Sequence, residues 1–312
     1  MLLLFLARFI GISVNGAYGW ISVAGVTIQP AEYLKIIIIW YLAHRFSKQQ
    51  EEIATYDFQV LTQNQWLPRA FNDWRFVLLV LIGSLGIFPD LGNATILVLV
   101  SLIMYTVSGI AYRWFSTILA LVSATSVFVL TTISLIGVET FSKIPVFGYV
   151  AKRFSAFFNP FADRADAGHQ LANSYFAMVN GGWFGLGLGN SIEKRGYLPE
   201  AHTDFVFSIV IEEFGFVGAS LILALLFFMI LRIILVGIRA ENPFNAMVAL
   251  GVGGMMGLIP STGVTFPFLS QGGNSLLVLS VAVAFVLNID ASEKRAKLYR
   301  ELENQPMNLL LK

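Results

Sequence analysis

Long runs of apolar residues constrain this chain more than any other feature of its sequence. A helix that spans a bilayer needs about 20 mainly apolar residues, and backbone inside lipid must satisfy its hydrogen bonds internally. The pattern therefore predicts an all-α, polytopic membrane helix bundle, a single integral membrane domain over residues 1–312 with about eight transmembrane helices. The apolar segments lie at about residues 1–14, 28–46, 75–89, 92–111, 115–137, 205–238, 244–260 and 272–289.

Composition supports the membrane class and excludes several functions. Hydrophobic residues make up 56% of the chain and charged residues only 12%, whereas an ordinary soluble domain carries about 25% charged residues. A net charge of +1 provides no basic field for nucleic acid. There is no cysteine, so disulfides and thiolate catalysis are excluded. The three histidines are widely spaced and form no metal-ligand pattern.

The distribution of lysine and arginine predicts the orientation, because short cytoplasmic loops are enriched in both. The joins 15–27, 90–91 and 261–271 contain neither residue. The joins on the other side carry or abut Arg45, Lys48, Arg69, Arg75, Arg113, Arg232 and Arg239. We therefore expect a cytoplasmic tail at 291–312 and a large extracellular loop at 138–204 that caps the bundle. Loops of that length are exempt from the charge rule.

Ionisable residues inside apolar segments are functional candidates by default. Glu32 and Lys35 are three residues apart, so they share one helix face. They form either an ion pair that satisfies itself or a cation placed for an anionic substrate. Glu212 and Glu213 stand together in the sixth segment. For these two a structural role is favoured, with one carboxylate facing a cavity and the other a helix partner.

Asp204 stands where the long loop returns to the membrane, just before Phe205. A carboxylate at a helix N-terminus is often a cap that stabilises the helix dipole. The alternative is a general base at the boundary of water and lipid, tuned by apolar neighbours. Cations lie on the same side of the membrane, and together with Lys35 they could bind a pyrophosphate. They are Lys152, Arg153, Lys194 and Arg195.

A glycine-rich run at residues 181–189 resembles a phosphate-binding loop only superficially. No strand precedes it, and no Gly-Lys-Ser/Thr follows it. Close packing of backbone at the membrane surface is the better interpretation.

Several short blocks occur in a fixed order along the whole chain. They are Asn15-Gly16-Ala17 with Trp20; Gln29-Pro30-Ala31-Glu32 with Lys35; Pro89-Asp90-Leu91-Gly92; Arg153 with Asn159-Pro160; Gln170 with Ser174; Gly181-Gly182 with Gly185 through Gly189; Lys194; Leu198 through Phe205; Glu212-Glu213 with Gly215; and Gly257 through Ser275. With these blocks the sequence resembles the SEDS family (shape, elongation, division and sporulation), whose members include FtsW, RodA and SpoVE. The stretch 259–275 is most like the FtsW branch.

The resemblance also marks two departures from the family. Members of the family have ten spanning helices, so we expect this chain to be N-terminally truncated by two: either Met1 is a misassigned start inside the third helix, or the sequence is a fragment. Many relatives carry an arginine after Asn15-Gly16, where this chain has Tyr18-Gly19. An anion contact from that arginine would have to come from another residue here.

The resemblance implies a peptidoglycan glycosyltransferase that joins lipid II disaccharide units into glycan strands. It would act at the division septum of a bacterial cytoplasmic membrane, during cell division. Asp204 becomes the expected catalytic base for the acceptor hydroxyl. Lys35, Arg153 and Lys194 become candidate contacts to the pyrophosphate. The other candidate substrate-binding residues are Glu32, Glu200, His202, Ser270 and Gln271.

The expected partners are lipid II, a class B penicillin-binding protein and other divisome proteins. A divalent cation is possible, although no cluster in the sequence demands a metal. Two alternatives remain: a lipid II flippase or transporter, and a divisome scaffold without chemistry of its own. For the enzyme we expect Lys35, Glu200 and Asp204 to share one outward-facing groove bordered by lipid, since the substrate joins an anionic head to an apolar tail.

Overall fold

The computed structural model describes residues 12–14, 17–23, 26–55, 91–109, 112–136, 161, 168–258 and 266–303. Contacts divide the chain into two units. Unit 1 comprises Met1–Ala111, Phe227–Phe268 and Gly272–Lys312, and unit 2 comprises Tyr112–Leu226 and Leu269–Gln271.

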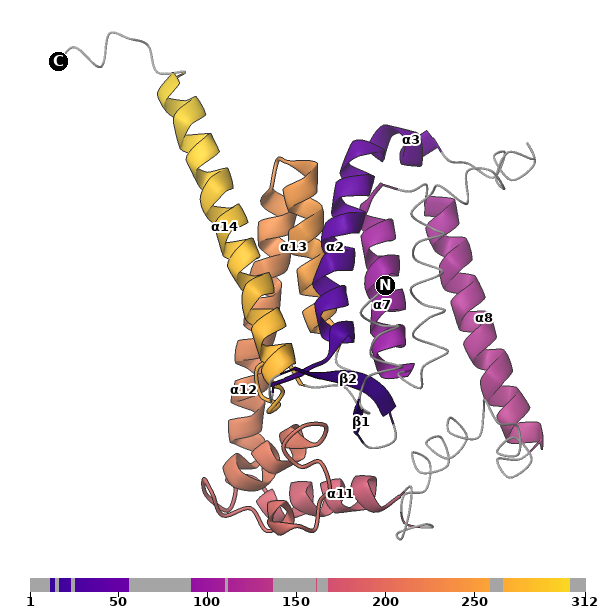
Figure 1. Cartoon of the computed structure of the whole chain (residues 1–312), viewed down its shortest axis with the longest axis vertical. Helices are drawn as coiled ribbons and strands as arrows, with labels where there is room; N and C mark the ends of the chain where they lie inside the picture. Colours follow the sequence, from indigo (N-terminus) through magenta and orange to yellow (C-terminus); the bar gives the residue numbers. More distant parts are fainter. Residues whose placement is uncertain are drawn as a thin grey trace, which may run out of the picture. The chain divides into compact units, whose positions relative to one another are not determined.

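Unit 1 is built around α13, which packs against α2, α7 and α14 (Figure 1). The bounds of its helices are α2 Pro30–Lys48, α3 Gln50–Thr55, α7 Leu91–Val107, α13 Pro243–Gly257 and α14 Gly273–Glu303, with the second part of α12 (Val206–Arg239). Small residues let the helices approach closely, as is common in membrane bundles. A Cβ on Gly251 would lie 2.5 Å from Met104 Sδ and 2.8 Å from Ile39 Cγ2.

Local sequence explains where the helices of unit 1 begin. Pro30 and Pro243 each lie in the first turn of a helix, where the missing N–H of proline costs nothing. The side chain of Asn242 accepts a 2.9 Å hydrogen bond from the backbone N–H of Phe244, which caps α13.

The helices predicted at 28–46, 92–111, 244–260 and 272–289 are confirmed as α2, α7, α13 and α14. Their ends differ from the prediction by a few residues or, in α14, by a longer extension.

A three-stranded antiparallel sheet precedes α2, and the sequence did not predict it. The strands are β1 Ile12–Val14, β2 Ala17–Val23 and β3 Val26–Ile28, with Ile12 opposite Trp20 and Ile21 opposite Ile28. The prediction of a helix through residue 14 is wrong for residues 12–14. Alternating β-branched residues and the Asn15-Gly16 pair favour a hairpin here, and that signal was overlooked.

Unit 2 contains α8 Tyr112–Ile136, α11 His169–Gly181, the short 3-10 helix η1 Glu193–Arg195 and the first part of α12. The spans predicted at 115–137 and 205–238 are confirmed as helices. The predicted loop 138–204 contains α11 and η1 as structure of its own. The segments 1–11 and 75–89, also predicted to span, lie outside the described residues.

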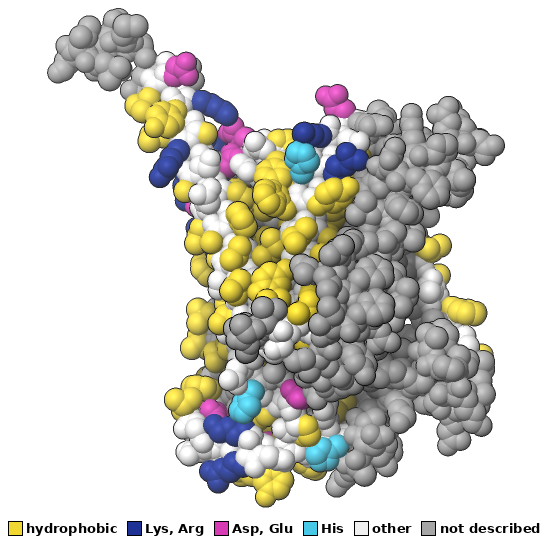
Figure 2. Space-filling model, in the orientation of Figure 1, with side chains coloured by type: hydrophobic (Ala, Val, Ile, Leu, Met, Phe, Trp, Pro, Cys, Tyr) yellow, Lys and Arg dark blue, Asp and Glu magenta, His cyan; other side chains and the backbone are white. Residues whose placement is uncertain are grey.

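Within the described part of the chain, α12 and α14 are long and apolar enough to cross a membrane. Only 22% of the most apolar stretch of α12 is buried, so most of its apolar side chains face outward. Hydrophobic side chains cover the middle of the unit 1 helices, and charged side chains gather at the end where α14 extends (Figure 2). This arrangement is that of a helical membrane protein.

Candidate active site

Asp204 lies two residues before the first residue of α12. The carbonyl of Phe205 accepts hydrogen bonds from the backbone N–H of Ser208 and of Ile209. Phe205 therefore occupies the N-cap position, and Asp204 precedes it. Asp204 is half-buried and stands just before the N-terminal end of a long helix, where the helix dipole favours negative charge.

The turn before Asp204 is held by the backbone of Glu200. Glu200 has a left-handed conformation with φ 53°, which is uncommon for a residue other than glycine. Its carbonyl accepts from the backbone N–H groups of Thr203, Asp204 and Phe205 at 3.1, 3.2 and 3.3 Å. The Thr203 hydroxyl also donates to Glu200 Oε2 at 2.8 Å. These bonds fix the backbone of Asp204 relative to that of Glu200.

A distant segment completes this turn. Ser270 Oγ donates to the carbonyl of Thr203 at 2.5 Å, and the backbone N–H of Gln271 donates to the carbonyl of His202 at 2.8 Å. Beneath the turn, Leu198, Ala201 and Ile209 form a buried apolar cluster, and Phe205 packs against it. The structure thus brings together five residues predicted from the sequence, namely Glu200, His202, Asp204, Ser270 and Gln271.

Helix α12 is broken eleven residues after Asp204, at Gly215, whose φ is 71° and ψ 179°. In an unbroken helix the N–H groups of Phe216 and Val217 would bond to the carbonyls of Glu212 and Glu213. Here those two N–H groups donate to the carbonyls of Gly182 and Trp183, at 2.9 and 3.1 Å.

The two carbonyls of α12 that lose their helical partners accept hydrogen bonds from the same loop, the glycine-rich residues 181–189. The carbonyls of Glu212 and Glu213 accept from the N–H groups of Leu186 and Gly187, both at 2.9 Å. The glycine-rich loop therefore inserts into the hydrogen-bond ladder of the helix. A Cβ on Gly185 would lie 2.2 Å from the carbonyl oxygen of Glu213, so the close backbone packing predicted for residues 181–189 is confirmed.

Glu212 is fully buried and organises the segment that leads to Asp204. Its carboxylate accepts from Ser191 Oγ at 2.5 Å, from the N–H of Ile192 at 3.1 Å, from the N–H of Glu193 at 3.4 Å and from Asn180 Nδ2 at 3.4 Å. The structural role that the sequence favoured for Glu212 agrees with these contacts. Ser191 and Asn180 were missed, and only the isolated Glu212-Glu213 pair signalled that partners must exist.

The neighbouring Glu213 forms a salt bridge with Lys194. Glu193, whose backbone N–H donates to the Glu212 carboxylate, is buried, and its Oε2 has no hydrogen-bond partner among the described residues. Burial raises the pKa of Glu193, and the nearby Glu212 carboxylate raises it further, while His169 opposes the shift. Lys194 therefore sits in a compact charged cluster at the base of the loop.

The other candidates predicted from the sequence are Glu32, Lys35 and Arg153. Lys35 and Glu32 form an ion pair of 2.6 Å in α2 of unit 1, and both are buried. Their shared helix face is confirmed. Because they belong to unit 1 and Asp204 to unit 2, the predicted common groove stays a prediction. Arg153 lies outside the described residues. Within the described part of the chain, no three His, Asp or Glu side chains gather to hold a metal.

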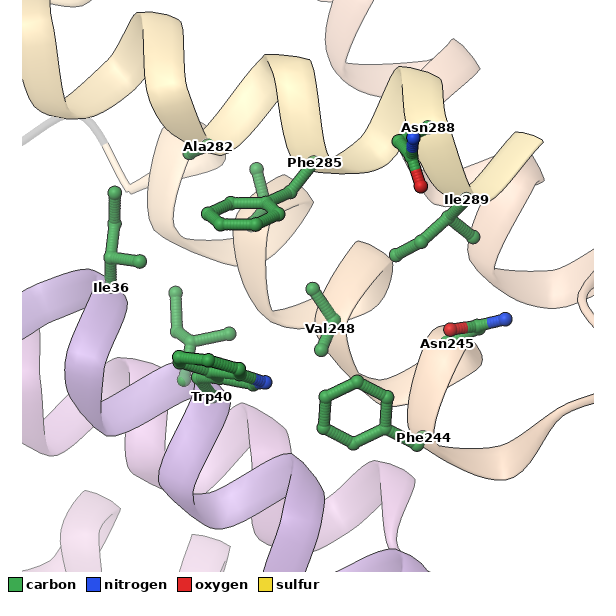
Figure 3. A pocket seen from close by; sticks show the side chains of 11 residues that line it. Ile36, Trp40, Phe244, Asn245, Val248, Ala282, Phe285, Asn288 and Ile289 are labelled. Atoms are coloured by element: carbon green, nitrogen blue, oxygen red, sulfur yellow. The ribbon is translucent and has the colours of Figure 1, made fainter. Parts of the chain in front are cut away.

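An apolar cavity in unit 1 is a poor place for transfer chemistry. It measures about 190 Å³ between α2, α13 and α14. Trp40 and Phe285 face each other across it, with ring centroids 6.3 Å apart, and Asn245 and Asn288 lie toward one end (Figure 3). No titratable side chain lines this cavity, so the polar turn around Asp204 is the better candidate.

The sequence profile of the cell cycle proteins FtsW, RodA and SpoVE matches residues 1–295. This chain belongs to that family. Among relatives of the FtsW/RodA/SpoVE family, the "Probable peptidoglycan glycosyltransferase FtsW" of Lactococcus lactis is 50% identical over 305 residues, which is 93% of this chain and 72% of the relative. The protein of the same name in Bacillus subtilis is 34% identical, over 88% of this chain and 67% of the relative.

Solved structures of the FtsW/RodA/SpoVE fold agree with the architecture. A chain of a peptidoglycan synthase complex that coordinates polymerization and crosslinking superposes with a TM-score of 0.68 at 23% identity, covering 94% of this chain and 78% of that one. RodA of Thermus thermophilus gives a TM-score of 0.58 at 22% identity, covering 94% and 75%. At these identities the likeness establishes the fold.

Proposed function

We propose that this chain is a peptidoglycan glycosyltransferase of the FtsW branch, which joins lipid II disaccharide units into glycan strands during septal wall synthesis. The observation that carries the proposal is the converging turn around Asp204. There Asp204 stands, half-buried, just before a long apolar helix, on a turn that is held by the nearby carbonyl of Glu200 and by the distant Ser270 and Gln271. The family and the 50% identity to an FtsW supply the reaction class.

In this reaction the acceptor sugar hydroxyl attacks the anomeric carbon of the donor and releases a lipid pyrophosphate. The hydroxyl needs a base, and Asp204 is the proposed one. The leaving group is already anionic, so it needs stabilisation by cations more than protonation. A positioned base contributes about 10²–10⁴-fold in rate. Pre-organised electrostatic stabilisation of the leaving charge is usually at least as large.

The cations for the pyrophosphate are proposed to be Lys35, Lys194 and Arg153, with Glu32, Glu200, His202, Ser270 and Gln271 around the sugars. Lys35 and Lys194 are each held by a carboxylate, Glu32 and Glu213 respectively. Such a pair holds the lysine side chain in place when the substrate is absent. A divalent cation could share the charge of the pyrophosphate.

The proposed membrane setting is the bacterial cytoplasmic membrane, with residues 138–204 forming an extracellular cap and the C-terminus in the cytoplasm. The absence of cysteine allows a clean test with single-cysteine variants. Gln271→Cys should react with an impermeant thiol reagent in intact cells, and Lys297→Cys only after lysis. Labelling of Lys297→Cys from outside would overturn this topology.

A class B penicillin-binding protein is the proposed partner, which would cross-link the strands that this chain makes. A flippase or a non-catalytic scaffold is the alternative function. The discriminating measurement is polymerisation of purified lipid II by the detergent-solubilised protein, with and without that partner. In detergent no membrane has to be crossed, so strand synthesis there favours the enzyme over the flippase.

Asp204→Asn tests the base directly. Asparagine has nearly the same size and shape as aspartate, and Phe205 rather than Asp204 is the N-cap of α12, so the variant should fold and bind its partner normally. It cannot accept a proton from a sugar hydroxyl at neutral pH, so polymerisation should fall by about 10²-fold or more. Asp204→Glu displaces the carboxylate by about one methylene and should also be severely impaired. Near-normal strand synthesis by Asp204→Asn would defeat the catalytic assignment and leave the family membership intact.

A further inference from the structure

A second cavity of unit 1, which is polar, lies between the C-terminal end of α12 and the charged part of α14. It measures about 210 Å³. On α12 it is lined by Arg232 and Arg239, which are seven residues apart and therefore share one helix face. On α14 the lining includes Lys294 and Lys297, with the carboxylates of Asp290 and Glu293 on the same face.

Both lining carboxylates are already engaged. Asp290 pairs with Lys294 at 2.6 Å. Glu293 accepts from Asn245 Nδ2 at 2.8 Å and from the backbone N–H of Glu241 at 3.1 Å. Lys297 lies 3.9 Å from a Glu241 carboxylate oxygen.

The two guanidinium groups on α12 remain unmatched. Arg232 and Arg239 have no carboxylate partner among the described residues. The lining therefore carries four basic and two acidic side chains, which leaves an excess positive charge of two. Guanidinium groups suit phosphate oxygens in particular, because their planar donors bind two oxygens at once.

The surface next to the cavity, toward the middle of both helices, is apolar. Phe228 lies one turn before Arg232 on α12 and is 62% exposed, and Leu287 lies one turn before Asp290 on α14 and is 65% exposed. Arg232 stands about 10 Å along the axis from Arg239, given a rise of about 1.5 Å per residue. Exposed apolar side chains continue past Arg232 at Leu235 and Ile238, so Arg232 lies within the apolar part of α12 and Arg239 at its end. This is the boundary region where lipid phosphates lie and where arginine side chains extend toward them.

We propose that the α12–α14 cavity binds the phosphodiester headgroup of an anionic phospholipid, whose acyl chains lie along Phe228 and Leu287. Arg232 and Arg239 hold the phosphate, and Lys294 and Lys297 supply a positive rim. Basic pockets between membrane helices are known to bind such headgroups. With the orientation proposed above, the lipid belongs to the cytoplasmic leaflet.

The competing explanation is that these cations only follow the general preference of lysine and arginine for the cytoplasmic side. In that case any cation on this end of α14 would contribute equally. Arg295 provides a matched control, because it lies on the same part of α14, is exposed, and does not line the cavity. If the cavity is a specific binding site, lipid binding depends on the lining arginines and does not depend on Arg295.

The test uses the purified, delipidated protein in detergent, titrated with dioleoyl phosphatidylglycerol or dioleoyl phosphatidylcholine, with bound lipid counted by native mass spectrometry. Phosphatidylglycerol should bind more tightly than phosphatidylcholine. Arg232→Gln/Arg239→Gln should weaken binding of phosphatidylglycerol about tenfold or more, as expected for lost charge-assisted hydrogen bonds. Arg295→Gln should stay within about twofold of the parent protein.

A charge-preserving variant guards against misfolding. Arg232→Lys/Arg239→Lys keeps both charges and should bind more tightly than the glutamine variant but less tightly than the parent, since lysine cannot form the two-pronged contact. Equal affinity for the two lipids would overturn the proposal. So would equal weakening by Arg295→Gln, or displacement of phosphatidylglycerol by glycerol 3-phosphate at equal concentration, which would indicate a site for free phosphates.

Discussion

The side-chain hydroxyl of Ser270 lies 2.5 Å from the backbone carbonyl oxygen of Thr203, although the two residues are 67 positions apart. The following residue, Gln271, donates its backbone N–H to His202 in the same way. The turn directly before Asp204 is therefore held by a segment that enters the fold just before α14. The position of the proposed base depends on a contact that no local stretch of sequence contains.

Removal of that contact should affect catalysis more than folding. Ser270→Ala loses one hydrogen bond, worth about 1 kcal/mol of stability. It also frees the turn at Thr203, and a displacement of about 1 Å at a reacting group can reduce the rate by up to about 10²-fold. We expect lipid II polymerisation to fall by about tenfold or more, with a small change in melting temperature. Ser280→Ala, at an exposed position on α14, should leave both unchanged.

The junction of the glycine loop with α12 can be tested with two matched alanines. Gly185 and Gly189 have similar positive φ angles, 79° and 85°, but only at Gly185 would a Cβ meet another atom, the Glu213 carbonyl oxygen at 2.2 Å. Both substitutions carry the backbone strain of about 1 kcal/mol that a side chain adds at positive φ. Gly185→Ala adds a steric clash and should lower stability by about 3 kcal/mol in total or prevent folding. Equal melting temperatures for the two variants would contradict the packing described here.

The buried carboxylate of Glu212 should contribute more to the stability of the fold than the carboxylate of Glu213. Glu212→Ala leaves Ser191 Oγ and the N–H groups of Ile192 and Glu193 without their acceptor, and each buried unsatisfied group costs about 1–3 kcal/mol. Stability should fall by about 3 kcal/mol or more, with new proteolysis between residues 182 and 205. Glu213→Ala loses the partly exposed Lys194 and the backbone N–H donors of Gly189 and Ser191. Because Glu213 retains some exposure whereas Glu212 is fully buried, the loss at Glu213 should cost less. A smaller loss for Glu212→Ala than for Glu213→Ala would refute this ranking.

Glu193 should make the stability of unit 2 depend on pH. Its pKa is raised by burial and then by Glu212, against the opposing influence of His169. The folded state therefore holds this proton more tightly than the unfolded chain. That contribution to stability is complete below the unfolded pKa and is lost as the pH rises through the folded pKa. Glu193→Gln stays neutral at every pH.

The expected result for Glu193→Gln is a higher melting temperature than the parent at about pH 7 and the same one near about pH 4. Glu301→Gln removes one charge from an exposed position of α14 and controls for the change in net charge. A lower melting temperature for Glu193→Gln at about pH 7 would show that the ionised carboxylate stabilises the fold.

Much of the helical architecture could be predicted from the sequence, because spanning helices follow from apolar length alone. The helices α2, α7, α8, α12, α13 and α14 each contain most of a predicted segment. The sheet at residues 12–28 was missed, because a short alternating pattern carries less signal than an adjacent apolar run. The continuation of α14 through Glu303 was missed because the predicted segment ended with the apolar run at residue 289, whereas a helix can continue through charged residues once it leaves the membrane.

The candidate site could be predicted only in part. The family blocks pointed to Asp204, Glu200, His202, Ser270 and Gln271, and these residues do converge. The contacts that hold them are mostly made by backbone groups, such as the carbonyl of Glu200, and backbone groups leave no trace in side-chain identity. The break at Gly215 could not be predicted either, since glycines are common in membrane helices and a glycine alone does not indicate a break.

That break also bears on how the protein is made. The carbonyls of Glu212 and Glu213 and the N–H groups of Phe216 and Val217 are completed by residues 182–187. Without that loop, α12 would satisfy these four groups only as an unbroken helix, because each open backbone group costs several kcal/mol in hydrocarbon. The loop is synthesised before α12 and, in the proposed orientation, is already across the membrane. The break in α12 therefore forms only as the loop docks, so that bending of the helix and folding of the loop become a single event.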